Sequence, residues 1–188
     1  LPLHDLIKRL SEIDGLERIR LGSLSPNIIS EKFLEQVSAI DKVMPHFHLS
    51  LQSCSDKILK LMKRPYSKQN IIDKVDLIRK YFPNCMLSAD IIVGFPGEDE
   101  DDYLETESAL VELNLFHVHA FPYSEREGTP AATMPYSVDK KIRAERNTRL
   151  INACARNKKA ILDSFVGNTV SILIEKIVND VCIGHSGE

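Results

Sequence analysis

The 188-residue sequence lacks long apolar runs, and its four cysteines stand far apart. A helix that spans a bilayer needs roughly 20 consecutive apolar residues, and no stretch of the chain approaches that length. Cys54, Cys85, Cys154 and Cys182 form neither CxxC nor CxxxCxxC spacing, which argues against a metal knuckle and a disulfide framework. We therefore expect no membrane segment, no metal site and a reducing cytoplasmic location.

Motifs of several enzyme classes are also missing. The chain has no Walker loop, no GxGxxG and no Gly-x-Ser-x-Gly elbow, and its six histidines are scattered. The first residues, LPLHDLIKRL, lack the basic start and long apolar core of a signal peptide, and there is no initiator methionine. We expect the chain to begin within a longer protein. Its composition, 43% hydrophobic with a net charge of -3, is typical of a globular chain.

Apolar patterns predict strands near residues 18, 48, 90 and 119, which alternate with amphipathic helices. These intervals suit βα repeats, so we predict an α/β fold with four parallel strands. Pro45 is expected to close the second helix. A complete (βα)8 barrel needs roughly 250 residues, so the four units form either part of a barrel or an open sheet. The expected helices cover residues 2–13, 30–43, 57–62, 68–82 and 103–113.

The stretch ADIIVGFPGE, residues 89–98, joins an apolar strand to a glycine-rich turn and an acidic helix start. Glycines in such a turn let a backbone approach a ligand closely, because no Cβ intervenes. The acidic run after the turn suits the first turn of a helix, where the helix dipole favours negative charge. Ligands of parallel α/β folds bind at the carboxyl ends of strands, so we expect a site at this turn.

The region after residue 130 differs in charge from the rest of the chain. Residues 137–160 hold eight basic and two acidic residues in a protein that is net acidic. This helix is either a nucleic-acid footprint or a solvated surface face. Residues 167–177 and 181–188 then predict two strands of a small β domain.

Histidines form two pairs at strand positions i and i+2, His46 with His48 and His117 with His119. Each pair shares one face of its strand. The pairs are either metal ligands or interior side chains, and the second reading is favoured because no carboxylate or thiol completes a ligand set at suitable spacing.

The four expected strand ends carry short polar groups and bare backbone. They comprise Gly22-Ser23, Gln52-Ser53, residues 94–98 and residues 123–129. Together they suit a ligand that bears a ribose, an amine and a carboxylate.

Four ordered stretches resemble the radical S-adenosylmethionine methylthiotransferases. They are RIRLGSLSP (18–26), HLSLQSCSDKILKLMKRPY (48–66), ADIIVGFPGE (89–98) and FPYSEREGTPA (121–131). The resemblance implies the last four βα units of a partial parallel, TIM-like barrel in residues 1–135. It further implies a basic helical linker in residues 136–165 and the start of a small RNA-binding β barrel, the TRAM domain, in residues 166–188.

The chemistry implied by the resemblance is insertion of a methylthio group at an unactivated C-H bond. The implied cofactors are S-adenosylmethionine and two 4Fe-4S clusters in the full-length enzyme, and the implied partner is tRNA. No residue of this chain is assigned a catalytic role. The implied S-adenosylmethionine contacts are Ser23, Gln52, Ser53, Arg64, Asp90, Gly94 and Glu98, and the implied RNA contacts are Tyr123, Arg126, Thr129, Arg143, Arg146 and Lys158.

Within the family, GSLSP and HLSLQS look most like the branch that modifies N6-threonylcarbamoyladenosine beside the tRNA anticodon. The alternatives are the branch acting on isopentenyladenosine, the branch acting on a ribosomal protein, and a non-catalytic RNA-binding module on a barrel scaffold. The sequence departs from the family at Cys54, where glycine is usual, and in lacking the cluster cysteines. We therefore expect a fragment that is inactive alone.

We predict that this chain takes up no stoichiometric iron-sulfur cluster when it is reconstituted anaerobically with iron and sulfide, because no cysteine triplet is present. Iron and sulfide analysis with the visible absorption spectrum measures this. Stable binding of a four-iron cluster would contradict the assignment of the chain as a fragment.

Overall fold

The described part of the chain, residues 1–187, folds around one parallel sheet in the computed structural model. The strand order is β1-β2-β3-β4, every neighbouring pair is parallel, and β1 and β4 form the two edges. The four predicted parallel strands are therefore confirmed. Their bounds are β1 (Ile19–Leu24), β2 (Val43–Gln52), β3 (Met86–Val93) and β4 (His117–Pro122).

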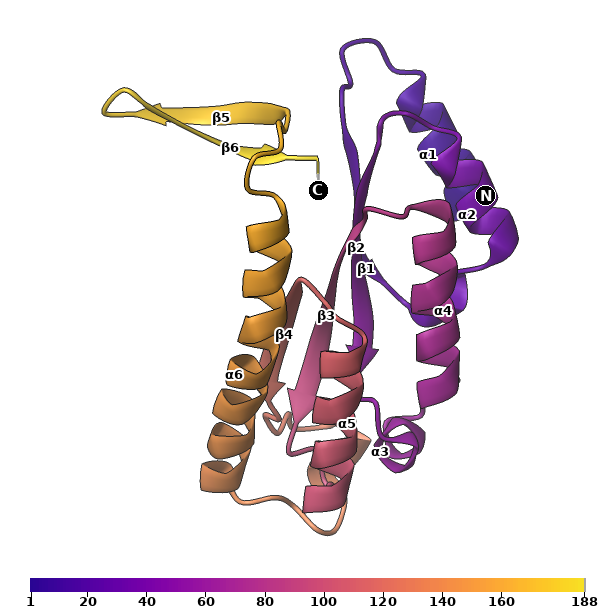
Figure 1. The fold of residues 1–188 in the computed structure, drawn as a ribbon. Coiled ribbons are helices and arrows are strands. Elements are labelled where there is room, and N and C mark those ends of the chain that lie inside the picture. Colours follow the sequence, from indigo (N-terminus) through magenta and orange to yellow (C-terminus); the bar gives the residue numbers. More distant parts are fainter. Residues whose placement is uncertain (188) are drawn as a thin grey trace.

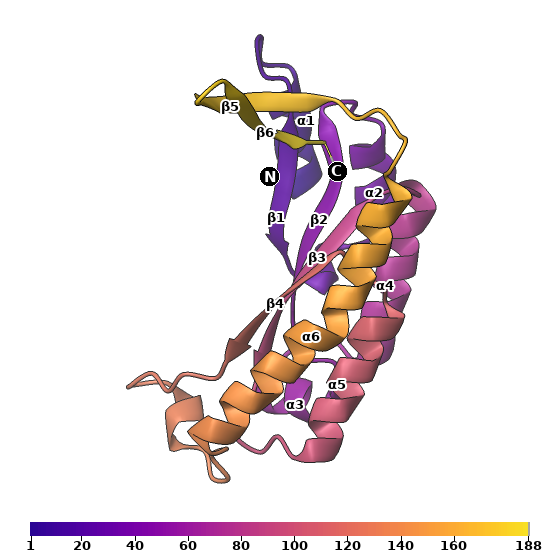
Figure 2. The same ribbon diagram turned by 60° about the vertical axis from the view of Figure 1, so that its left-hand side comes forward.

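Helices cover one face of this sheet (Figure 1). On that face Leu21, Phe47 and Leu87 are neighbours across three strands, and all three are buried. The longest helix, α6, runs back along β4 and α5 (Figure 2). The elements are α1 (Leu3–Ser11), α2 (Glu31–Ser38), α3 (Asp56–Leu61), α4 (Lys68–Tyr81), α5 (Glu100–Glu112) and α6 (Lys140–Ser164), with 3-10 turns η1 (Pro26–Ile28) and η2 (Pro130–Thr133).

Helix starts follow from capping side chains. The Ser55 hydroxyl accepts a hydrogen bond from the Ile58 amide and begins α3. At α5, Asp99 and Asp102 form a reciprocal capping box, and the predicted acidic run fills the first turn. The chain therefore turns into a helix directly after the glycine-rich turn that follows β3.

The second helix is shorter than the sequence pattern predicts. α2 ends at Ser38, and β2 begins at Val43, so Pro45 lies inside a strand rather than at a helix end. A proline has no amide to donate to a sheet ladder. It is tolerated here because the pairing of β1 with β2 shifts register between Val43 and Phe47, and pairing with β3 begins at His46.

The core is centred on β2, which lies between β1 and β3. Phe47 is fully buried, and its ring meets that of Phe82 edge to face at a centroid distance of 4.9 Å. Cys54, which follows β2, is also fully buried, and burial raises the pKa of its thiol to about 12. Cys54 is therefore a packed, neutral thiol.

Two predicted strands near the carboxyl end form an antiparallel hairpin of β5 (Ile172–Val178) and β6 (Val181–Ser186). The hairpin lies at the end of the sheet opposite the strand arrowheads (Figure 1). Arg18 donates to the carbonyl of His185 at 2.9 Å, and Arg20 donates to that of Ser186 at 3.1 Å. The predicted second strand extended to Glu188, which lies outside the described residues.

Among residues 1–187, no helix combines the length and apolarity needed to cross a membrane. The division into a barrel part, a linker and a β domain stays a prediction.

Burial predicts which thiols react in the native protein. Cys182 is exposed on β6, whereas Cys54 and Cys154 are buried and have raised thiol pKa values. Because the thiolate is the reactive form, a colorimetric disulfide reagent at pH 8 should modify Cys182 rapidly and Cys54 only after unfolding.

The Cys182→Ser variant is the matched control, and it should lose the rapid phase. Rapid labelling at Cys54, located by peptide mass spectrometry, would contradict the packed position of this thiol.

Candidate functional site

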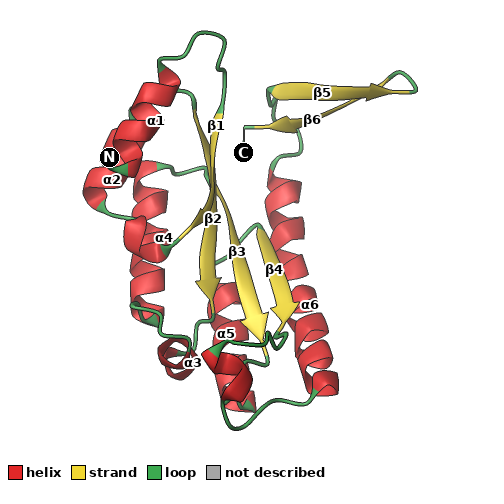
Figure 3. Ribbon diagram, turned by 180° about the vertical axis from the view of Figure 1, so that it is seen from behind, coloured by secondary structure: helices red, strands yellow, loops and turns green. Residues whose placement is uncertain are grey.

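A pocket of about 560 Å³ opens at the carboxyl ends of β2, β3 and β4. Figure 3 shows these strand ends meeting at one edge of the sheet. The pocket brings together five residues that the sequence singled out. Its lining comprises Gln52, Asp90, Ile92, Phe121, Pro122, Tyr123, Ser124, Arg126, Thr129 and Ala131.

Strand alternation places Asp90 in this pocket. Along β3, Ala89, Ile91 and Val93 are buried under the helices, so Asp90 and Ile92 point to the open face. The Asp90 carboxylate lies 3.0 Å from Nε2 of His48 on β2. Nδ1 of the same imidazole is 2.8 Å from the Ser88 hydroxyl, so both ring nitrogens of His48 have partners.

Gln52 and Ser53 are adjacent at the end of β2, but their side chains lie in different environments. Gln52 has a φ of 69° and lines the pocket. Ser53 is buried instead, where its hydroxyl lies 3.2 Å from that of Thr106 and accepts a hydrogen bond from the Ser55 amide. Ser53 therefore supports the turn into α3 rather than facing the pocket.

Ser23 and Arg64, two further predicted cofactor contacts, do not line this pocket. Ser23 is exposed at the end of β1 with a φ of 51°. Arg64 follows α3, and its amide donates to the Leu59 carbonyl at 2.8 Å.

The glycine-rich turn after β3 is held by a buried ion pair. Glu98 Oε1 accepts hydrogen bonds from the Gly94 amide at 2.7 Å and from Arg146 Nη1 at 2.8 Å. Arg146 also donates to the Glu98 carbonyl. Burial raises the pKa of the Glu98 carboxyl, and the Gly94 amide and Arg146 oppose that rise. Gly94 and Glu98 therefore shape the turn. The Glu98 carboxylate, which was expected to contact a ligand, is hydrogen-bonded to protein groups instead.

Two arginines of α6 that the resemblance implies as RNA contacts are buried. Arg143 is 4% exposed and Arg146 is 5% exposed. The Arg143 guanidinium donates to the carbonyls of Val138 and Tyr123 and to the Glu125 carboxylate. The RNA contacts implied for Arg143 and Arg146 stay predictions, and in this structure both guanidinium groups donate to protein acceptors instead.

The open face of the sheet collects the four paired histidines in a second cavity, together with Lys158. Lys158 Nζ lies 5.3 Å from the ring centroid of Phe116, so this predicted RNA contact is half-buried beside β4. Burial lowers the pKa of His46 to about 4, with contributions from Arg20 and His48. His46 is therefore neutral near pH 7.

Asp90 is a carboxylate that accompanies these histidines, which their spacing in the sequence does not reveal. Asp90 reaches His48 because the two residues occupy the same face of adjacent strands. That relation follows from the parallel register, in which His48 is opposite Ser88. Even so, residues 1–187 contain no group of three or more His, Cys, Asp or Glu side chains arranged to hold a metal ion.

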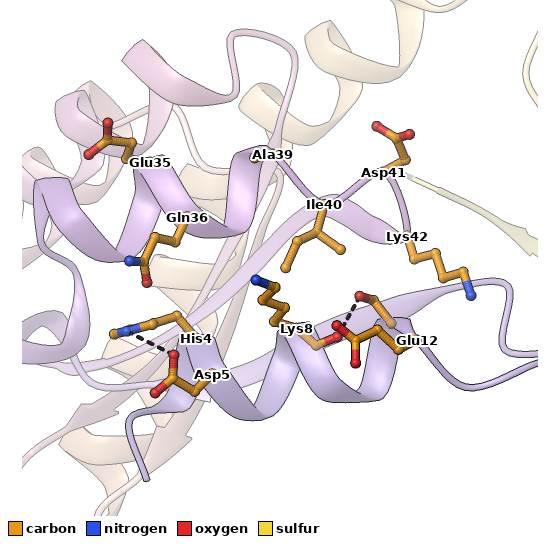
Figure 4. A pocket seen from close by; sticks show the side chains of 11 residues that line it. His4, Asp5, Lys8, Glu12, Glu35, Gln36, Ala39, Ile40, Asp41 and Lys42 are labelled. Atoms are coloured by element: carbon orange, nitrogen blue, oxygen red, sulfur yellow. Dashed lines mark hydrogen bonds and ion pairs between the residues drawn. The ribbon is translucent and has the colours of Figure 1, made fainter.

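A further hollow lies between α1 and α2 (Figure 4). Its walls carry charges of both signs, such as Lys8, Glu12 and Glu35, and His4 Nε2 lies 3.6 Å from Asp5. It is built from α1, α2 and the segment between α2 and β2, away from the carboxyl ends of the strands at which the predicted residues converge.

A family profile described as the Radical SAM superfamily matches residues 1–110. The chain belongs to this superfamily. The tRNA-2-methylthio-N(6)-dimethylallyladenosine synthase of Alkaliphilus oremlandii is 41% identical over 171 residues, covering 91% of this chain and 36% of that protein. The threonylcarbamoyladenosine tRNA methylthiotransferase of Bacillus subtilis is 34% identical over 177 residues, covering 92% of this chain and 39% of that protein.

A ribosomal protein uS12 methylthiotransferase of Clostridioides difficile is also 34% identical, over 95% of this chain and 40% of that protein. The resemblance to methylthiotransferases is thereby confirmed, without a choice of branch. The chain spans somewhat more than a third of the length of these relatives.

Solved structures of the same superfamily share the fold. Coproporphyrinogen III oxidase from Escherichia coli matches with a TM-score of 0.59 at 17% identity, covering 87% of this chain and 38% of that chain. A radical S-adenosylmethionine methyltransferase from Kitasatospora setae matches with a TM-score of 0.55 at 16% identity, covering 69% of this chain and 26% of that chain. At such identities the similarity concerns the fold alone.

Gly94→Ala should destabilise the chain by about 3 kcal/mol, because the φ of 73° is strained for alanine and the new Cβ would lie 2.4 Å from Arg143 Cγ. Gly128→Ala is the matched control. Gly128 has a φ of 79° with open space around it, so only the backbone cost of about 1 kcal/mol applies. Urea unfolding measures both, and equal losses would contradict the close packing of Arg143 on Gly94.

Proposed function

We propose that this chain is part of a methylthiotransferase that uses S-adenosylmethionine to modify an adenosine of tRNA. The pocket at the carboxyl ends of β2 to β4 carries this proposal. It occupies the edge at which parallel α/β folds bind ligands, in a chain that belongs to the radical SAM superfamily.

The residues of the pocket fit S-adenosylmethionine by chemistry. Asp90 offers a carboxylate to an ammonium group, and the Gln52 amide suits a ribose hydroxyl. Ile92, Phe121 and Pro122 provide an apolar wall for a purine ring.

One residue of the pocket lining carries a polar atom that is without a hydrogen-bond partner within residues 1–187. The Tyr123 hydroxyl oxygen is buried and has no hydrogen-bond partner among the described residues. A buried polar atom without a partner costs free energy, and because this oxygen has almost no accessible surface, a ligand would pair with it only if the ring turned toward the pocket.

Iron-sulfur clusters do not fit the thiols of this chain. Cys54 and Cys154 are buried, Cys85 is half-buried, and Cys182 is exposed on the hairpin. Within residues 1–187 these thiols do not join a metal-binding group. The cluster sites of the proposed enzyme therefore belong to protein outside this chain.

S-adenosylmethionine, when bound and reductively cleaved, supplies the radical that opens a C-H bond. This chain would position that cofactor. His48 orients the Asp90 carboxylate, since its other ring nitrogen is engaged by Ser88. Tyr123 and the apolar wall would keep water away from the reacting region.

Substrate RNA would approach the loop after β4, where Tyr123, Arg126 and Thr129 line the pocket. Arg126 is exposed and suited to a phosphate. The hairpin, which we propose as the start of an RNA-binding β domain, lies at the other end of α6. A helix of 25 residues is about 37 Å long, so RNA that touched both regions would span the sheet.

We favour threonylcarbamoyladenosine as the modified base because of the GSLSP and HLSLQS stretches. A second candidate is dimethylallyladenosine, which the higher identity of 41% favours. A ribosomal protein substrate and a non-catalytic RNA-binding role are the remaining alternatives.

Deletion of the gene should remove the methylthio form of threonylcarbamoyladenosine from bulk tRNA and leave its precursor to accumulate. Nucleoside mass spectrometry measures both species, and a complemented strain is the control. Loss of the methylthio form of dimethylallyladenosine instead would identify the second candidate. Unchanged levels of both nucleosides, in a strain that makes them and has no second copy of the gene, would contradict a tRNA-modifying role.

A further inference from the structure

We propose that Arg143 is a positioning residue of the pocket, in which it sets the orientation of Tyr123. This inference rests on the proposed function of the pocket. Arg143 lies on α6, outside the barrel strands, and does not line the pocket itself. Its effect on a ligand would therefore pass through Tyr123.

The Arg143 guanidinium donates hydrogen bonds both to the segment that follows β4 and to the segment that precedes α6. Nη1 donates to the Tyr123 carbonyl at 2.8 Å, and Nε donates to the Val138 carbonyl at 2.7 Å. Nη2 donates to the Glu125 carboxylate at 2.9 Å and to the Ser137 hydroxyl at 2.8 Å. The loop that leaves β4 and the segment that enters α6 are thus joined by one side chain.

The same guanidinium also lies against the Tyr123 ring, with its central carbon 5.2 Å from the ring centroid. Phe95 meets that ring edge to face at 5.2 Å. The Tyr123 amide donates to the Val93 carbonyl at 2.8 Å. Tyr123 is therefore fixed by its backbone, by an aromatic neighbour and by Arg143.

The shape of the arginine side chain and the number of its N–H donors both favour arginine at position 143. The aliphatic stem of Arg143 packs on Gly94, where any Cβ would collide with it. The planar guanidinium presents several donors in a fixed fork, and here four acceptors use them. A lysine keeps the charge but cannot make this set of hydrogen bonds.

The experiment labels the chain with 3-fluorotyrosine and records fluorine NMR spectra. The chain has five tyrosines, and the Tyr123→Phe variant assigns the Tyr123 signal. Arg143→Lys should shift or broaden that signal, because the ring loses a neighbour that holds it. S-adenosylhomocysteine should shift the same signal in the original protein, and Arg143→Lys should weaken its binding about tenfold.

Arg149→Lys is the matched control. The Arg149 guanidinium lies 4.6 Å from the ring centroid of Tyr103 and pairs with Glu100. It should disturb the Tyr103 signal, leave the Tyr123 signal in place and leave the affinity for S-adenosylhomocysteine unchanged.

Different results would contradict the proposed cofactor pocket and the positioning role of Arg143. If S-adenosylhomocysteine leaves the Tyr123 signal and every other signal unchanged, the proposed cofactor pocket is contradicted. If the ligand binds and Arg143→Lys alters neither the Tyr123 signal nor the affinity, the positioning role of Arg143 is contradicted. Thermal unfolding of each variant checks that it is folded. A loss of fold would also move all five NMR signals, whereas the change expected here is confined to Tyr123.

Discussion

The buried ion pair between Arg146 and Glu98 joins the last helix to the turn after β3. Charges that leave water need partners, and this carboxylate finds them in a guanidinium and in the Gly94 amide. Removal of the Arg146 charge would leave the buried Glu98 carboxylate without its ion-pair partner, whereas Arg146 also pairs with Glu100 at 3.2 Å. The turn, the start of α5 and the long helix α6 therefore depend on each other, although they are distant in sequence.

The geometry of the pocket depends on two parts of the structure, strand β3 and the loop after β4. One wall comes from strand alternation, which turns Asp90 and Ile92 toward the open face of the sheet. The rest of the lining comes from the loop after β4, in which no strand alternation fixes the directions of the side chains. That loop is held from α6 through the contacts of Arg143 with Tyr123 and Glu125. The helix that the resemblance implied to be a linker thus contacts the loop that lines the pocket.

The basic segment shows why a count of charges does not define a binding surface. Its arginines divide between two environments, because Arg143 and Arg146 are buried whereas Arg156 is exposed. The buried ones satisfy carbonyl and carboxylate acceptors of the fold. Only the exposed groups remain available to phosphate, so the sequence overstates the charge that this helix could offer to RNA.

The sequence alone determined the four parallel strands and the acidic start of α5, because periodicity and the charge preference of a helix start act over a few residues. It also placed Gln52 and residues 123–129 at one edge of the sheet, since parallel strands end at a common edge, whereas Asp90 was implied only by the family resemblance. It misjudged the end of α2, because a proline usually marks a helix boundary and here lies where strand pairing is irregular. Only the tertiary structure decided that Ser53 is buried, that His48 holds Asp90 and that Arg143 packs on Gly94. Those contacts depend on the direction of side chains and on the packing of α6, which no local pattern specifies.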